Sequence, residues 1–119
     1  MDQTEAAHAL ASADRQILLH ELVERNGEAT ITKLSREVAA RRNKISPEKI
    51  DEEKCERAQV RLIHIHLPQL VEKDVLSINR KNRTVAFGEK KEIDQLFEVA
   101  AEVESWPPTD LLDYPSRNG

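Results

Sequence analysis

The stretch from Lys54 to Phe87 constrains the fold of this chain most, because it predicts a long amphipathic helix that runs directly into a β-hairpin. At about 100° per residue, one narrow arc of the helix is polar and nearly all of the opposite side is apolar. The polar arc holds Lys54, Arg57, Arg61, His64 and Glu72. The apolar side holds Cys55, Ala58, Leu62, Ile63, Leu67, Leu70 and Val71. We therefore expect one side of this helix to cover a core and the other to show a basic strip.

The hairpin is predicted from two short segments, 75–79 and 83–87, in which apolar and polar residues alternate as they do in β-strands. Their predicted buried face consists of Leu76, Ile78, Val85 and Phe87. The turn places three cations at its tip, Arg80, Lys81 and Arg83. A basic hairpin tip is suited to contact with a phosphate backbone or a minor groove. A plain solvated turn is the alternative.

The residues before the long helix predict the rest of the domain. Ser12 or Asp14 begins a helix that ends at Asn26 and Gly27, residues 28–31 form a short strand, and Thr32 caps a second helix. The pattern lapses between residues 41 and 50, and Asp51 then caps the long helix. This order of parts is that of a winged helix. The predicted fold class is α+β and mostly helical: a winged helix-turn-helix with a small antiparallel hairpin wing and an additional C-terminal helix.

Pro68 and two histidines interrupt the regular helical pattern. Pro68 has no N–H to donate, so a kink or local break is expected near residues 65–67. His64 and His66 point about 200° apart on a helix and cannot share one metal ion. His66 is expected to be buried and hydrogen-bonded, and His64 to donate to phosphate or base. With Cys55 as the single cysteine, we predict no metal and no cofactor.

The C-terminal helix is expected over residues 89–106, where the spacing of three and four marks an apolar seam. This seam consists of Ile93, Leu96, Phe97, Ala100 and Val103. It is predicted either to pair two chains in a twofold dimer, the outcome we favour, or to fold back as a lid on the helix around residues 17–23. The predicted organisation is a winged-helix domain over 12–88, this dimerisation helix, and flexible tails over 1–11 and 107–119.

The net charge of −4 is distributed unevenly along the 119 residues. Residues 1–32 carry −4, residues 33–83 carry +5 and residues 84–119 carry −5. A cationic middle between acidic ends is typical of a DNA-binding face on an acidic protein. A chance fluctuation in a highly charged chain is the alternative.

Several classes of protein are disfavoured by what the sequence lacks. With only three glycines there is no phosphate-cradling loop, and no motif activates a nucleophile, so an enzyme is not expected. No apolar run is long enough to span a bilayer, and the first residues do not form a signal peptide. A cytoplasmic protein without a membrane partner is expected.

The run from Val60 to Leu76 resembles the recognition-helix-to-wing passage of ArsR-like transcription regulators. More closely, the element formed by His64, His66, Leu67, Pro68 and Leu70 resembles a family of small haloarchaeal winged-helix proteins. The resemblance covers roughly residues 13–88 and implies a winged-helix fold and transcriptional regulation. The single cysteine departs from the ligand sets of metal-sensing ArsR-like proteins, so metal sensing is not implied.

These observations lead to the hypothesis of a sequence-specific transcription regulator that binds double-stranded DNA as a homodimer. The arc of Lys54, Arg57, Arg61 and His64 would enter a major groove, with both arginines facing solvent. The hairpin cations would contact phosphates. The alternative is a winged-helix adaptor that binds another protein and not DNA. An adaptor would show an apolar patch on this arc, so the basic arc favours DNA.

Overall fold

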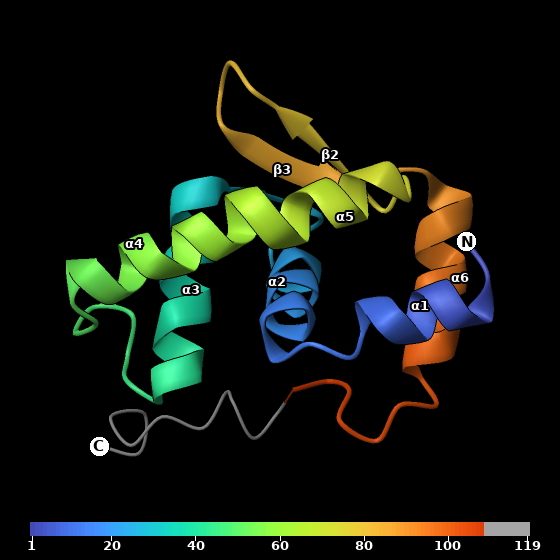
Figure 1. Ribbon diagram of the computed structural model, residues 1–119, viewed down its shortest axis with the longest axis horizontal. Coiled ribbons are helices and arrows are strands. Elements are labelled where there is room, and N and C mark those ends of the chain that lie inside the picture. The colour runs from blue at the N-terminus through green and yellow to red at the C-terminus, as the bar shows by residue number, and fades with distance from the viewer. Residues whose placement is uncertain (109–119) are drawn as a thin grey trace.

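The computed structural model describes residues 1–108, and the expected tail beyond them, residues 109–119, lies outside the described part. The chain is an α+β protein, mostly helical, with a small antiparallel sheet (Figure 1). Its helices are α1 (Gln3–Ala9), α2 (Ala13–Glu24), α3 (Ile31–Asn43), α4 (Glu52–Arg61), the π-helical turn η1 (Leu62–His66), α5 (Leu67–Glu72) and α6 (Lys90–Ala100). Its strands are β1 (Glu28–Thr30), β2 (Leu76–Asn79) and β3 (Thr84–Phe87).

α4, η1 and α5 join end to end into one rod, residues 52–72, which we call the long helix (Figure 1). Asp51 caps it as expected, because its side chain accepts a hydrogen bond from the Lys54 N–H at 2.9 Å. The expected irregularity before Pro68 is present as η1, where the Leu67 N–H reaches back five residues to the Leu62 carbonyl. A π-helical turn relieves the crowding that a proline ring causes in a regular helix.

The three strands form one antiparallel sheet in the order β1-β3-β2. β2 and β3 are the predicted hairpin, with Leu76 opposite Phe87 and Asn79 opposite Thr84. β1 adds to the other side of β3 and passes directly into α3, which is capped by Thr30 instead of the expected Thr32. The predicted inner face of the hairpin is confirmed, since Leu76 and Val85 are buried and Ile78 and Phe87 are half-buried.

The core lies where the long helix crosses α2 and α3 (Figure 1). It is built mostly from leucines, isoleucines and valines, each of which contributes about 1.5–3 kcal/mol when fully buried. Those that are completely or almost completely covered include Ile17, Leu18, Leu22, Leu34, Val38, Leu62, Leu67 and Leu70. This packing fixes which side of the long helix faces solvent.

The predicted flexible tail over residues 1–11 is wrong, because those residues form α1 and pack against α6. Asp2 and Glu5 form a capping box at the start of α1, and Ala6 is completely buried. Alanine-rich helices carry no clear apolar stripe, so the sequence pattern gave little sign of this one. The helix matters for the fold because it covers α6.

The expected dimer seam is partly covered by the chain itself. Of its five residues, Leu96 and Ala100 are fully buried, and Ile93, Phe97 and Val103 are half-buried. α6 packs on α1, and the Phe97 ring lies 5.8 Å from the ring of Phe87 and 5.5 Å from that of Trp106. Much of the seam is therefore covered within one chain. The twofold dimer through this helix stays a prediction, which light scattering tests.

No helix within residues 1–108 combines the length and apolar character needed to cross a membrane.

Candidate nucleic-acid interface

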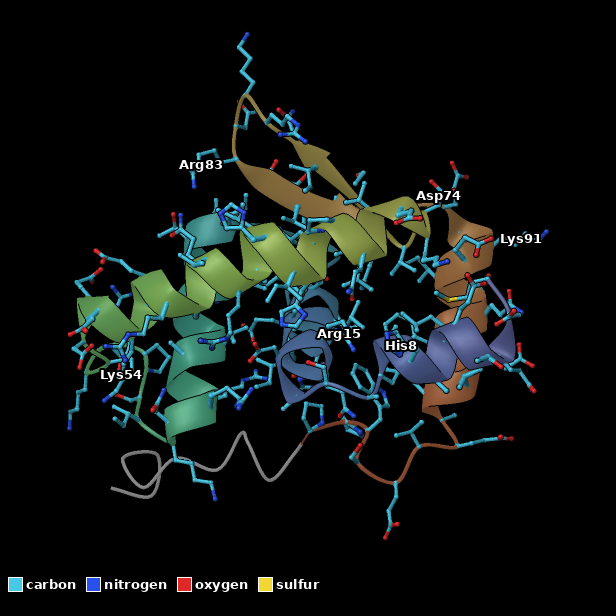
Figure 2. The ribbon with its side chains drawn as sticks, in the orientation of Figure 1. His8, Arg15, Lys54, Asp74, Arg83 and Lys91 are labelled. Carbon is cyan, nitrogen blue, oxygen red and sulfur yellow. The ribbon has the colours of Figure 1, made fainter. Side chains whose placement is uncertain are left out.

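The tip of the β2–β3 hairpin carries three exposed cations, Arg80, Lys81 and Arg83. The turn is held by the Asn79 side chain, which accepts a hydrogen bond from the Asn82 N–H at 3.1 Å. Within residues 1–108, none of the three cations has an ion-pair partner. Figure 2 shows Arg83 near the tip of the hairpin, above the long helix. The tip is therefore a concentrated positive charge open to an external anion.

Arg83 has a left-handed backbone conformation, with φ at +54°. This conformation costs a residue other than glycine about 1–2 kcal/mol, and asparagine less than most. The carbonyl of Arg83 accepts a hydrogen bond from the Ile31 N–H at 3.0 Å, which ties the end of the turn to the start of α3. An arginine thus occupies a position where glycine or asparagine would be less strained, and this points to use of its side chain.

The residues of the predicted basic arc of the long helix lie in different environments. Arg57 is exposed and pairs with Glu53 one turn earlier, and Lys54 lies 3.7 Å from Asp51. Exposed pairs of this kind contribute about 0–1 kcal/mol, so a phosphate group can displace the acid. Figure 2 places Lys54 at the end of the long helix far from the hairpin. His64 is exposed, as expected.

Arg61 is not the solvent-facing side chain that was expected. Its Nε–H donates to Asp14 Oδ2 at 2.8 Å, across 47 residues of sequence, and only part of its side chain is exposed. A helical wheel gives the direction in which Arg61 leaves its helix, but not the acid that α2 places beside it. Its first role is therefore to hold the long helix against α2.

Asp14 is the centre of a buried polar cluster, which we call the Asp14 joint: Asp14, Arg15, Arg42, Arg61 and His66. The Asp14 carboxylate is 3% exposed and accepts from Arg42 at 2.7 Å, from Arg61 at 2.8 Å and from His66 Nε2 at 3.0 Å. Burial alone would raise the pKa of Asp14. The hydrogen bonds from His66 and Arg61 and the positive charges of Arg61 and Arg42 hold that pKa below its usual range instead.

His66 is buried and hydrogen-bonded, which confirms its predicted structural role. Its Nδ1 lies 3.2 Å from an Arg15 guanidinium nitrogen. Because arginine only donates, Nδ1 must accept the hydrogen bond from Arg15. Nε2 must then carry the proton and donate a hydrogen bond to Asp14. Arg15 also donates to the carbonyls of His8 and Ala9, each at 2.9 Å, and Figure 2 shows it between α2 and the long helix. The joint therefore fastens α1, α2, α3 and the long helix together.

The outer face of the long helix also contains residues that the predicted arc omitted. Glu53 and Glu56 are exposed near its start, and Val60 and Ile65 are 57% and 48% exposed further along. Glu53, Glu56 and Val60 precede the π-helical turn, so a regular wheel at 100° per residue describes them, and the predicted arc was narrower than the exposed face. The face is therefore mixed in character, and its acidic end lies away from the hairpin.

Metal binding finds no support in the arrangement of ligand-type residues. His64 is exposed while His66 is buried in the Asp14 joint. Within residues 1–108, no group of three histidine, cysteine, aspartate or glutamate side chains is arranged to hold a metal ion. Cys55 is buried on the inner side of α4 and belongs to the core.

Comparison with the curated proteins and with the solved structures found no match. Residues 7–86 match the model of a protein family described as a domain of unknown function, DUF7344. The match begins in α1, ends within β3 and covers more than half of the 119 residues. The chain belongs to the DUF7344 family.

Proposed function

We propose that this protein is a winged-helix transcription regulator of the cytoplasm that binds double-stranded DNA. Three features support the proposal. The elements follow the order helix, strand, helix, long helix, hairpin, and the sheet has β3 between β1 and β2, as in a winged helix. The long helix is displayed across one side of the molecule (Figure 1). The likeness of residues 60–76 to ArsR-like regulators points the same way.

The observation that carries the proposal is the hairpin tip. Arg80, Lys81 and Arg83 are exposed and, among residues 1–108, have no acidic partner. Cations that neutralise phosphates release condensed counterions from DNA, and this release supplies most of the affinity of non-specific binding. A positive tip can therefore bind a duplex although the whole chain is acidic, because the acidic groups lie mainly on other elements.

Within this proposal, Arg57 and His64 are the long-helix residues best placed to contact DNA. Both are exposed, and the Arg57 pair with Glu53 is weak enough to exchange for a phosphate. Arg61 has a different task, because its Nε–H is already bound to Asp14. The carboxylates near the start of α4 repel phosphates, so Arg57 would mark one limit of the contact and the duplex would extend from it toward the hairpin.

A protein-binding adaptor is the second candidate, and one observation favours it. Val60 and Ile65 are large apolar side chains that remain 57% and 48% exposed on the outer face of the long helix. Exposed aliphatic residues on a helix are typical anchors of a protein interface. They separate the two candidates, because DNA binding depends on the hairpin cations and adaptor binding on these two residues.

The test measures binding to a random-sequence DNA duplex by fluorescence anisotropy at low salt. The triple variant R80Q/K81Q/R83N should bind at least about tenfold more weakly than the wild type. The matched double variant V60S/I65S changes exposed residues without altering charge and should bind nearly as well as the wild type. Circular dichroism checks that both remain folded. Wild-type protein that fails to bind the duplex would reject DNA binding and leave the adaptor.

A further inference from the structure

A shallow groove runs between the long helix and the hairpin, with a volume of about 340 Å³. Its lining is mainly apolar, with Ile63, Pro68 and Val71 of the long helix and Ile78 of β2, and it also includes two arginines, Arg80 and Arg83. The volume is at the lower end of the range for small-molecule sites. Apolar walls with a few polar groups at one place are also characteristic of such sites.

The two arginines give the groove its chemical preference. Both are exposed, and neither has an ion-pair partner among residues 1–108. A guanidinium matches a carboxylate with two parallel hydrogen bonds, which gives both energy and direction. The apolar lining offers nothing to a small hydrated anion such as phosphate, but it can cover a hydrocarbon body. The combination fits a molecule with a carboxylate at one end and an apolar body at the other.

We infer that this groove binds a small hydrophobic carboxylate, with its acid group on Arg80 and Arg83 and its apolar part against Ile63, Val71 and Ile78. The left-handed backbone at Arg83 agrees with a role for that side chain beyond closing the turn. Lys81 does not line the groove, although it is the same kind of exposed cation at the same tip. Two of the three hairpin cations therefore line the groove, and the third does not.

A regulatory consequence rests on the proposed function. DNA phosphates and the carboxylate would use the same two arginines, so only one of them can occupy these donors at a time. Binding of the acid would therefore lower the affinity for DNA, and DNA would lower the affinity for the acid by the same factor. The hydrophobic carboxylate would be an effector that releases the regulator from DNA.

The first experiment uses octanoate as the probe and the full chain without DNA. Titration is followed by the NMR signals of the methyl groups of Ile63, Val71 and Ile78. We expect saturable shifts with a dissociation constant of about millimolar order, as is usual for a ligand of this size. Octanol, which has the chain without the charge, and acetate, which has the charge without the chain, should each bind at least about tenfold more weakly.

Variants then locate the carboxylate. The double variant R80Q/R83N should weaken octanoate binding about tenfold, whereas K81Q, which removes one charge outside the groove, should leave it unchanged. Octanoate that causes no saturable shift in these methyl signals would overturn the inference. Equal weakening by K81Q would also overturn it, because the acid would then be responding only to the general charge of the tip.

The regulatory consequence has its own readout, which keeps the two proposals apart. Saturating octanoate should lower the affinity of the wild-type protein for the random duplex, and an equal concentration of octanol should not. Octanoate that binds without changing DNA affinity would overturn the regulatory consequence. Wild-type protein that binds octanoate but never binds DNA would instead reject the proposed function, while the groove assignment would stand on the methyl shifts.

Discussion

Two cationic regions lie on opposite sides of the long helix, one buried at the Asp14 joint and one exposed at the hairpin tip. At the joint, Arg42, Arg61 and His66 all converge on a single carboxylate that is almost completely covered. At the tip, three cations have no acidic partner within residues 1–108. The difference is that α2 supplies the cations of the joint with a buried acid, whereas the cations of the tip remain exposed and open to an external anion.

The largest expected effect is on the joint. Substitution D14A should lower the free energy of unfolding by about 3 kcal/mol, because it leaves the buried His66 Nε2–H without an acceptor and Arg42 and Arg61 without their common partner. Urea unfolding measures the change. The matched substitution E53A removes an equally charged but exposed partner, that of Arg57, and should cost less than about 0.5 kcal/mol.

Similar losses for D14A and E53A would contradict the distinction between a buried joint and an exposed surface. Asp14 would then behave as one more surface acid.

Lowering the pH should reduce the contribution of the Asp14 joint to stability. The pKa of folded Asp14 lies below its usual value, so its contribution to stability is fully present above about pH 4 and is lost as pH falls toward the lower folded pKa. The difference in unfolding free energy between wild type and D14A should therefore be constant at neutral pH. By about pH 3 it should shrink by about 1 kcal/mol. Urea curves at several pH values measure it, and a difference that grows in acid would refute the assignment.

The third prediction compares two arginines on the same helix. Substitution R61Q should lower the free energy of unfolding by about 1 kcal/mol, because it removes a charge-assisted hydrogen bond to Asp14. R57Q should change stability by less than about 0.5 kcal/mol but weaken DNA binding, because its partner Glu53 is exposed. Thermal unfolding and anisotropy together test both. The reverse pattern would mean that Arg61, not Arg57, reads the duplex.

The smallest expected change in stability is at Arg83. Asparagine tolerates a left-handed backbone better than arginine, so R83N should leave the free energy of unfolding unchanged or raise it by about 0.5 kcal/mol. The same variant should weaken DNA binding. Chemical denaturation and anisotropy on one preparation suffice. A marked loss of stability would mean that the Arg83 side chain supports the fold.

The part of the fold that could be predicted from sequence is the part governed by local periodicity. Alternating residues in 75–79 and 83–87 predicted the hairpin, and the Asp51 cap and the burial of His66 followed from short-range patterns. α1 was missed because its buried face consists of alanines, which form no clear apolar stripe in the sequence. Their burial depends on packing against α6, which is distant in sequence.

The candidate site was predicted only in part for a similar reason. The hairpin cations were found because their environment is the turn itself. Arg61 was assigned to the surface because its partner, Asp14, is 47 residues away in sequence. A regular wheel already places Ile65 beside Lys54 and Val60 near His64, so these two residues were missed because the predicted arc was built from polar side chains alone.

Binding of DNA phosphates by the exposed hairpin cations is the centre of the proposed function. Its most direct test is the slope of log affinity against log salt concentration for a random duplex, measured for the wild type and for R80Q/K81Q/R83N. Each phosphate contact contributes about 0.9 to the slope, so the triple variant should have a slope smaller by roughly 2 to 3. Equal slopes for the two proteins would contradict the claim.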